Sequence, residues 1–402
     1  MKNFYTLILS IAIYITAMAQ GTWTQKANFP GAKRWGSSSF SIGAKGYLGC
    51  GYDGSVNYSD FWEYDPAANV WTQKASMSLV RRAACAFAIN GKGYITGGIP
   101  ASGSFLTDTW EYDPTSNSWN AKANFPGAGR YGAASFAIGN KGYVCCGNEG
   151  SASGPFTNEL WEFDPSSNSW NAKANFTGNA RYGMSYSCFV IGTKGYVGLG
   201  GDASTQYTDF YAYDQSANSW SQVANYPGSG KGYCCGFGTC FKGFMGTGHV
   251  SSTVYSDFWQ YDDASNTWTQ VANFGGGGRW LMVSCVINGK AYTGTGYDFT
   301  NYYNDWWQYT CIDDAVNEID ADKLISVYPN PFSTQTTLHS DIALHNASIS
   351  VCNSVGQTVT EIKNISGQTI VLHCDDLPGG IYFVRIKTGS KIFTKKLVIT
   401  EK

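Results

Sequence analysis

The sequence predicts an all-β protein made of six repeated units followed by a smaller β-domain, and three observations support this prediction. Charged residues make up 14% of the 402 residues, whereas aromatic residues reach 16% and glycine occurs 48 times, a composition that favours short strands and tight turns. A tryptophan-containing phrase recurs at steps of 48 to 51 residues. Beyond residue 311 this phrase stops and short alternating strands take over.

The repeat is defined by two phrases. Asn-x-Trp occurs five times and has an earlier relative at Trp23; its tryptophans are Trp71, Trp119, Trp170, Trp220 and Trp268. A second phrase, rich in Trp and Tyr and usually followed by Asp, precedes each Asn-x-Trp, and its sixth copy is Trp306–Tyr309. Six copies of the second phrase predict six units.

Each unit also contains a small-residue strand, a turn and a glycine-rich strand, which makes four strands per unit with the two phrases. Small residues suit an innermost strand, where neighbouring units converge on an axis. Phenylalanine recurs in one register of this strand and is expected to wedge between units: Phe40, Phe87, Phe136, Phe189 and Phe237. An isoleucine two residues later keeps the same face in most units.

A repeat of this length with a glycine pair in its second strand, such as Gly97-Gly98 or Gly200-Gly201, resembles the kelch repeat, whose family fold is a β-propeller. The resemblance covers residues 21 to 310, although the pair is degraded in the other units. It implies a six-bladed kelch-type propeller over 20–311. We expect the orphan strand Thr22–Lys26 to complete the sixth blade beside Trp306–Tyr309, which removes exposed sheet edges.

The N-terminal residues 1–19 have the layout of a secretory signal peptide. A short basic start is followed by an apolar stretch from Phe4 to Ile15 and by small residues before a cleavage point between Ala19 and Gln20. A membrane anchor is the alternative, but the stretch is shorter than the roughly 20 residues that span a bilayer. After signal removal we expect no stable transmembrane segment.

The C-terminal part begins with an acidic connector, 312–323, for which a short cap on the propeller is the alternative to a linker. Residues 324–402 alternate as in a small, immunoglobulin-like β-sandwich. Motifs in this region resemble the C-terminal sorting domain of bacterial type IX secretion, and they contain Pro329, Asn330, Pro331, Gly379, Gly380, Tyr382, Lys395 and Lys396. The resemblance implies the type IX machinery as partner and delivery through the periplasm to the outer cell surface or the medium. An ordinary adhesive sandwich is the alternative.

Several classes of chemistry are not expected. The net charge of -2 and the absence of long basic runs argue against nucleic acid as a partner. His249 is the one histidine of the propeller region, whereas copper oxidases of the kelch class need more than one imidazole, so we expect neither metal nor cofactor. Most of the twelve cysteines are expected to be buried strand residues rather than bridges.

A cation, in most units with an aromatic residue directly or closely after it, recurs where each unit enters its innermost strand. The candidate ligand-binding residues are Arg34, Trp35, Arg82 (or Arg81), Arg130, Tyr131, Arg181, Tyr182, Lys231, Tyr233, Arg279 and Trp280. Guanidinium groups bind carboxylates and sulfates and aromatic faces stack on sugars, so a ring of such residues would suit an acidic or sugar-bearing ligand. Alternatively each cation pairs with a repeated acid of the blades, such as Asp60, Asp108, Asp209, Asp257, Asp305, Glu63, Glu111 or Glu162.

These features favour an exported, non-enzymatic binding propeller that engages a glycan or protein ligand through its variable loops, which lie at 52–58, 99–107, 148–157, 202–208, 249–256 and 297–304. The alternative is a metal-independent carbohydrate-active enzyme, because bacterial kelch propellers include a sialic acid mutarotase. No catalytic motif in the sequence supports the enzyme specifically.

Overall fold

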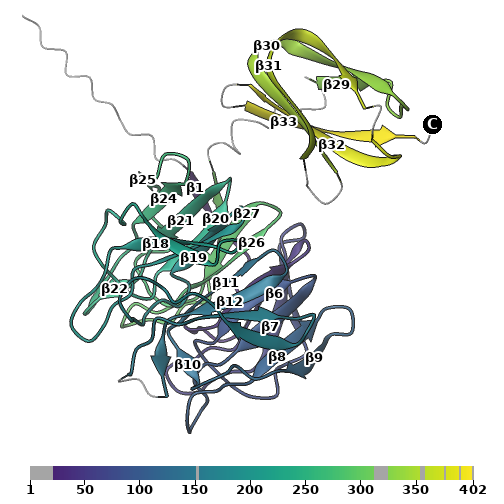
Figure 1. Ribbon diagram of the computed structural model, residues 1–402. Coiled ribbons are helices and arrows are strands. Elements are labelled where there is room, and N and C mark those ends of the chain that lie inside the picture. The colour runs from purple at the N-terminus through teal and green to yellow at the C-terminus, as the bar shows by residue number, and fades with distance from the viewer. Residues whose placement is uncertain are drawn as a thin grey trace, which may run out of the picture. The chain divides into compact units, whose positions relative to one another are not determined.

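The computed structural model describes residues 21–150, 154–311, 325–353, 358–374, 377–388 and 391–400, and within these ranges the chain is built of strands joined by turns and loops, without helices (Figure 1). The chain separates into two compact units, Met1–Cys311 and Ile312–Lys402. The predicted signal peptide, its cleavage pair Ala19 and Gln20, and the predicted connector 312–323 lie outside the described residues.

The first unit consists of six four-stranded antiparallel sheets, which we call blades I to VI. In blades I to V the strands follow one another in chain order from the innermost to the outermost strand. Their strands are β2(Ser38–Ile42), β3(Lys45–Gly49), β4(Phe61–Asp65) and β5(Val70–Lys74) in blade I; β6(Cys85–Ile89), β7(Lys92–Thr96), β8(Thr109–Asp113) and β9(Ser118–Lys122) in blade II; β11(Ala134–Ile138), β12(Lys141–Cys145), β14(Leu160–Asp164) and β15(Ser169–Ala172) in blade III; β16(Cys188–Ile191), β17(Lys194–Gly198), β18(Phe210–Asp214) and β19(Ser219–Val223) in blade IV; and β20(Cys235–Thr239), β21(Lys242–Gly246), β24(Phe258–Asp262) and β25(Thr267–Val271) in blade V. Two short ribbons add β10(Arg130–Tyr131) with β13(Asn148–Glu149), and β22(His249–Val250) with β23(Thr253–Val254).

Blade VI joins the two ends of the propeller. It contains β26(Val283–Ile287), β27(Lys290–Gly294), β28(Trp306–Thr310) and, as its outermost strand, β1(Thr22–Lys26). In the pairing of β1 with β28, Trp23 lies opposite Tyr309 and Gln25 opposite Trp307. The Trp23 indole donates to the Ala272 carbonyl of blade V at 3.0 Å. The predicted six-bladed propeller closed by its N-terminal strand is therefore confirmed.

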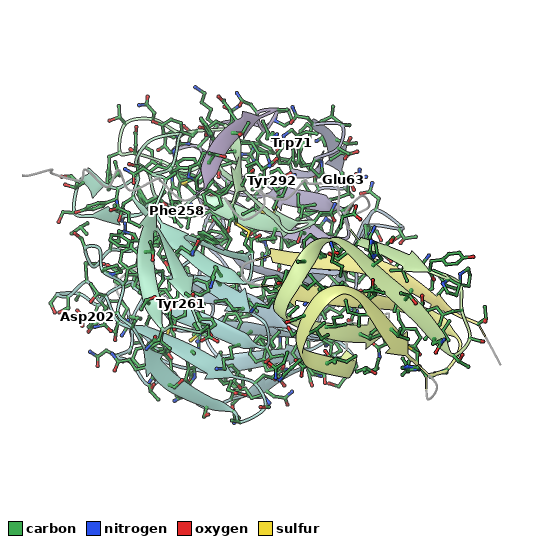
Figure 2. The ribbon with its side chains drawn as sticks, turned by 90° about the horizontal axis from the view of Figure 1, so that it is seen from above. Glu63, Trp71, Asp202, Phe258, Tyr261 and Tyr292 are labelled. Carbon is green, nitrogen blue, oxygen red and sulfur yellow. A yellow bond between two sulfur atoms is a disulfide. The ribbon has the colours of Figure 1, made fainter. Side chains whose placement is uncertain are left out.

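The predicted phenylalanine wedges pack against glycine in the next blade. A Cβ added to Gly93, at the second position of β7, would overlap the Phe40 ring of blade I, and Gly142 stands in the same relation to Phe87. The Lys-Gly-aromatic sequence of the second strands thus leaves room for a ring of the preceding blade. Trp71 of blade I and Tyr292 of blade VI also belong to one apolar cluster and lie near each other in Figure 2.

The Asn-x-Trp phrase ties each blade to the connection that enters it. In blade II the Asn117 side-chain oxygen accepts from the Ala75 N–H at 3.0 Å and from the Tyr112 hydroxyl at 2.8 Å, while the Trp119 indole donates to the Ala75 carbonyl at 2.8 Å. Asn117 has a φ of 49°, a left-handed conformation that asparagine tolerates better than most residues. The same contacts recur at Asn69, Asn218 and Asn266. The phrase that identified the units thus forms hydrogen bonds that hold each blade to the connection from the preceding blade.

A disulfide bond joins Cys240, in the turn between β20 and β21, to Cys311, which follows β28. It ties blade V to the last residue of the first unit. Of the other cysteines in the described residues, all are buried except the half-buried Cys352, and burial raises the pKa of thiols such as Cys85 and Cys188 to about 12.

The second unit is one five-stranded antiparallel sheet that bends until it is nearly closed. Its strands are β29(Ile325–Tyr328), β30(Gln335–Asn353), β31(Thr358–His373), β32(Gly380–Thr388) and β33(Lys391–Ile399). The long β30 pairs with β29, β31 and β32, with register shifts along its pairing with β31, and a bridge from Phe332 to Ile399 joins the other edges. Leu344, Ile349 and Val384 are among the core residues that the bend encloses.

The predicted sorting motifs meet at β33. The Asn330 side chain donates to the Lys396 carbonyl at 2.9 Å and accepts from the Val398 N–H at 2.8 Å, so that it pairs with β33 as a neighbouring peptide group would. The hydroxyl group of Tyr382, a residue that is 6% exposed, donates to the Pro378 carbonyl at 3.0 Å; Gly379 follows, and β32 begins at Gly380.

Candidate functional site

One end of the propeller carries both the entry to each innermost strand and the variable loops between second and third strands; we call it the rim face. Antiparallel order places these two features at the same end of every blade. At each entry one residue forms an isolated bridge or short ribbon with the start of the variable loop. The six entry residues and their partners are Trp35 with Tyr52, Arg82 with Ile99, Tyr131 with Asn148, Tyr182 with Gly201, Gly232 with His249, and Trp280 with Tyr297.

The cation that precedes each entry residue is buried and ion-paired within its blade. The exposed fraction of these cations is between 0% and 3%. The pairs are Arg34 with Asp60, Arg81 with Asp108, Arg130 with Glu149 and Glu159, Arg181 with Asp209, Lys231 with Asp257, and Arg279 with Asp305.

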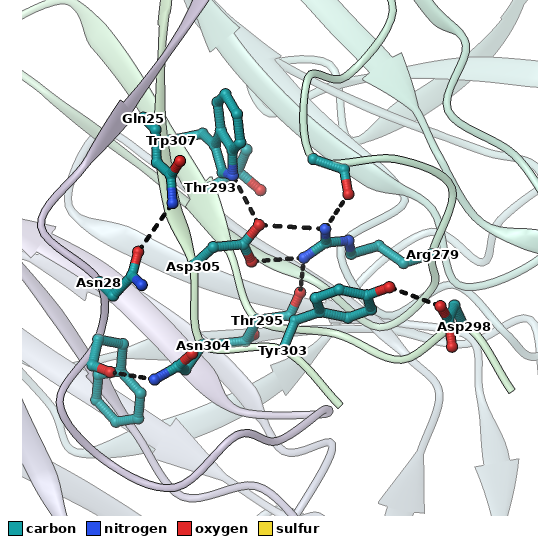
Figure 3. A network of polar contacts seen from close by, with 12 residues as sticks. Gln25, Asn28, Arg279, Thr293, Thr295, Asp298, Tyr303, Asn304, Asp305 and Trp307 are labelled. Atoms are coloured by element: carbon teal, nitrogen blue, oxygen red, sulfur yellow. Dashed lines mark hydrogen bonds and ion pairs between the residues drawn. The ribbon is translucent and has the colours of Figure 1, made fainter. Parts of the chain in front are cut away.

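The pair in blade VI shows the arrangement (Figure 3). Arg279 donates to both oxygens of Asp305, at 2.6 and 3.2 Å, and to the Thr295 carbonyl at 3.3 Å. The Trp307 indole donates to the same carboxylate at 2.8 Å. The Arg279 guanidinium also lies 3.6 Å from the centre of the Tyr303 ring. All of these partners lie in blade VI or its loop, so the pair holds that blade together.

These pairs correct the prediction of a cationic ring on the rim. Arg34, Arg130, Arg181, Lys231 and Arg279 are turned into their blades, where carboxylates and ring faces satisfy them, and their charges are not offered to a ligand. The alternative of pairing with repeated acids holds for them, with Asp60, Asp209, Asp257 and Asp305 among the acids named from the sequence. The glutamates Glu63, Glu111 and Glu162 instead accept hydrogen bonds from the hydroxyl groups of tyrosines in the second strands of their blades.

Arg82 differs from its neighbour Arg81. Arg81 occupies the buried position, and Arg82 stands at the entry position that is aromatic in most blades. The Arg82 guanidinium lies 4.5 Å from the Tyr52 ring centre and 5.7 Å from that of Trp35, and it donates to Asn57 at 2.8 Å. No carboxylate of the described residues pairs with it, and its buried Nε has no hydrogen-bond partner among them. Its charge therefore lies within the rim itself.

The predicted aromatic residues do come together. The rings of Trp35 and Trp280 stack with their centres 5.5 Å apart, and Tyr233 lies 5.3 Å from Trp280, 5.9 Å from Tyr131 and 6.2 Å from Tyr182. The loops add further rings against this cluster: Tyr52, Phe105, Phe156, His249 and Phe299. The buried indole Nε1 of Trp280 has no hydrogen-bond partner among the described residues.

Tyr233 fills the centre of the rim face. It stands where blades I, III and IV have Gly36, Gly132 and Gly183, and like them it has a positive φ, of 55°. Its N–H donates to the Gly183 carbonyl at 2.5 Å, and similar backbone bonds link neighbouring blades around the axis. A small pocket of about 40 Å³ remains beside Tyr182, Tyr233 and His249. The rim is thus a largely filled aromatic surface, not an open channel mouth.

Three of the surrounding loops are held by hydrogen bonds of a motif that the sequence analysis missed. Asp53 accepts from the backbone N–H groups of Ser55 and Val56 and from the Tyr58 hydroxyl, and the Tyr58 ring lies 3.9 Å from the Arg34 guanidinium. Burial alone would raise the pKa of Asp53, but these hydrogen bonds hold it below its usual range. The same arrangement recurs at Asp202, labelled in Figure 2, and at Asp298. An aspartate five residues before a tyrosine in three of the loops was the available signal.

Besides Arg82, the charges of the rim include the ionised loop carboxylates of Asp53, Asp202 and Asp298, whereas the side chains of His249 and Tyr131 add none. Burial lowers the pKa of His249, so its imidazole is neutral at pH 7, and burial raises the pKa of Tyr131 to about 12. Among the described residues no three His, Cys, Asp or Glu side chains are grouped to hold a metal ion. A search of the same residues for a helix long and apolar enough to cross a membrane finds none.

The fold and the repeated contacts define a class: a closed β-propeller with a separate C-terminal β-domain. Residues 80–243 match the family model of the KLHDC2/KLHL20/DRC7 Kelch-repeats domain, and residues 326–400 match that of the secretion system C-terminal sorting domain. The first unit thus contains a Kelch-repeat domain, and the second contains a type IX C-terminal sorting domain. A solved structure titled "Structure of YjhT" is similar to it, with a TM-score of 0.61 and 17% identity over 70% of this chain and 95% of that one. No curated protein matches the chain. The sorting domain supports secretion to the cell surface or medium through the periplasm.

Proposed function

We propose that this protein is an exported, non-enzymatic propeller that binds acidic glycans on its rim face. The type IX machinery would deliver it through the sorting domain, after a signal peptide at 1–19 has directed it to the periplasm. The observation that carries the proposal is the position of Arg82, a guanidinium with no carboxylate partner among the described residues, beside the stacked rings of Trp35 and Trp280.

The aromatic rings supply the surface for a sugar. Pyranose rings present C–H faces that stack on aromatic side chains, and the half-buried Trp35, Trp280, Tyr131 and Tyr182 offer such faces at fixed positions. Because the rim is filled by Tyr233 and three of its loops are held by internal hydrogen bonds, little ordering of these parts would be needed on binding.

Arg82 supplies the preference for an acidic group. Its half-buried guanidinium lies against the Tyr52 and Trp35 rings and donates to Asn57, and it keeps further N–H donors for a ligand. Carboxylate or sulfate oxygens, and sugar hydroxyl groups, would satisfy such donors, and a charge-assisted bond is stronger than a neutral one.

The test is a glycan array with carboxylated, sulfated and neutral glycans, followed by calorimetry on the hits. Arg82→Gln is expected to weaken the binding of acidic glycans about tenfold or more, and Trp35→Ala to weaken acidic and neutral glycans alike. The matched controls are two exposed positions: Lys33→Gln removes a charge next to Arg34, and Phe241→Ala lies in the turn between β20 and β21, at the opposite ends of the strands.

Absence of any bound glycan, or equal affinities in Arg82→Gln and Lys33→Gln, contradicts the proposal. Accelerated anomer exchange of sialic acid, followed by NMR, would establish the enzyme instead.

A further inference from the structure

The axis of the propeller contains a cavity of about 270 Å³ that is separate from the rim site. Its wall is made by the innermost strands of all six blades. Each blade contributes two or three consecutive residues, such as Ser39–Ser41 in blade I and Ala86–Ala88 in blade II, and Tyr186 lies beside them. The residues that directly follow the wedge phenylalanines, such as Ala88 and Val190, are half-exposed, so the cavity opens toward the hairpin turns and away from the rim face.

Tyr186 crosses the axis at the inner end of this cavity. The wedge phenylalanine follows the buried cation by six residues in blades I, II, III and V, but Phe189 follows Arg181 by eight. The two extra residues allow Tyr186, with a φ of 63°, to reach blade I, where its hydroxyl donates to the Ser37 carbonyl. Burial raises the pKa of Tyr186 well above its usual value, so this hydroxyl stays a donor. The cavity therefore has a floor at the starts of the innermost strands.

The wall is uncharged and mostly apolar. It contains no Asp, Glu, Lys, Arg or His. The Ser39 and Ser284 hydroxyls donate to carbonyls of the preceding blade, at 2.8 and 2.6 Å, and are thus already satisfied. Burial raises the pKa of both Cys188 and Cys285 to about 12, so these thiols are neutral at any physiological pH. A charged ligand would lose its hydration here without gaining a partner.

We propose that this axial cavity binds a small, uncharged, mainly apolar molecule of about the size of indole. An apolar protein cavity of about 150 Å³ is large enough to hold benzene, and this one has nearly twice that volume. The five phenylalanines that border it are each only 3–5% exposed, because their rings pack between blades, so a bound molecule would contact mainly the alanine, valine and cysteine side chains of the wall. The inference is independent of the glycan site, because the two sites share no residue.

The experiment is calorimetric titration of the full chain with indole, compared with indole-3-acetate as a charged relative. Saturable binding of indole, and binding of indole-3-acetate at least tenfold weaker, is expected. Ala137→Phe places a ring in the cavity and should weaken indole binding at least tenfold. Ala121→Phe, an exposed position of the outermost strand β9, is the matched control and should leave it unchanged.

Intermolecular NOEs between indole and the methyl groups of Ala88 and Val190 locate the ligand in the unaltered chain, so that the outcome does not depend on whether Ala137→Phe folds. Ala88→Leu, which adds less volume, is a second filling variant. The proposal is overturned if indole does not bind, if indole-3-acetate binds as tightly, or if the NOEs fall on the rings of the rim face. Unchanged affinity in a folded filling variant has the same consequence.

Discussion

Adjacent arginines with opposite environments allow a sharp test of the rim. Arg81 is 0% exposed and donates to both oxygens of Asp108, at 2.8 and 2.7 Å, and to the Gly97 carbonyl at 3.1 Å. Arg82 is half-buried and lies against rings of the rim. Replacing each by methionine keeps a side chain of similar length and removes its charge. We expect Arg81→Met to destabilise the propeller and Arg82→Met to leave it nearly as stable.

The magnitude follows from these contacts. Removing one partner of a fully buried ion pair costs about 3–5 kcal/mol. Asp108 keeps 27% of its side chain exposed and water can hydrate it in part, so we expect about 3 kcal/mol for Arg81→Met. Arg82→Met gives up two cation–π contacts and one hydrogen bond near the surface, together about 1 kcal/mol.

Thermal unfolding at pH 7 measures both variants. A unit of this size loses about 1.5–2 °C of Tm per kcal/mol, so Arg81→Met should lower Tm by about 5 °C and Arg82→Met by about 2 °C or less. Equal effects, or a larger one for Arg82→Met, would refute the assignment of the buried position to Arg81.

The pH dependence gives a second measurement of the same pair. Burial alone would raise the pKa of Asp108, but the hydrogen bonds and charge of Arg81, with the Trp110 N–H, hold that pKa below its usual value. A carboxylate with a lowered folded-state pKa stabilises the fold above its unfolded value of about 3.9, and this contribution disappears as the pH falls through the folded-state pKa. The stability difference between the wild type and Arg81→Met should therefore shrink below about pH 4. A difference that stays constant down to pH 2 would mean that Arg81 acts through packing alone.

Three further substitutions test the repeat and the tail. Gly142→Ala forces a Cβ into the Phe87 ring and should lower the free energy of unfolding by about 1–3 kcal/mol. A second change in the same chain, Phe87→Leu, should recover part of this loss. Wild-type stability in the single variant would contradict the packing of Phe87 against Gly142. Asn218→Ala removes an exposed hydrogen bond to the Ala174 N–H and places alanine at a φ of 47°, a loss of about 1–2 kcal/mol in denaturant unfolding, whereas Asn218→Gly should lose less because glycine tolerates that φ. Asn330→Ala removes two bonds to β33 and should speed hydrogen exchange in that strand; unchanged exchange would rule out the pairing role.

Most of the fold could be predicted because each repeated phrase corresponds to one kind of contact that recurs from blade to blade. The spacing of the tryptophans reflects one indole hydrogen bond per blade to the connection from the preceding blade. The orphan strand at Trp23 carries nearly the same residues as the outermost strands of the other blades and makes the same bond. The shape of the C-terminal sheet was harder to predict, because the length of β30 and its register shifts depend on three partner strands at once.

The candidate site could be predicted only in part. The aromatic members Trp35, Tyr131 and Trp280 were found because they repeat, but the repetition of the cations reflected ion pairs needed by every blade. The sequence alone could not decide which of Arg81 and Arg82 takes the buried position, because this depends on the register of β6, the strand that follows them. A shift of one residue in an extended chain turns a side chain to the other face, so an error of one position exchanges a structural residue for a rim residue.

By itself the sequence determined the number of blades, their closure by the first strand and the presence of a sorting domain, because these depend on residues close together or on strictly repeated ones. Only the tertiary structure decided that Tyr233 fills the rim, that Arg82 lies there without a carboxylate partner among the described residues, and that Tyr186 closes one end of the axial cavity. These features break the repeat, and each depends on contacts between blades far apart in the chain. Their side chains meet because the blades converge on one axis, which no local pattern of residues reports.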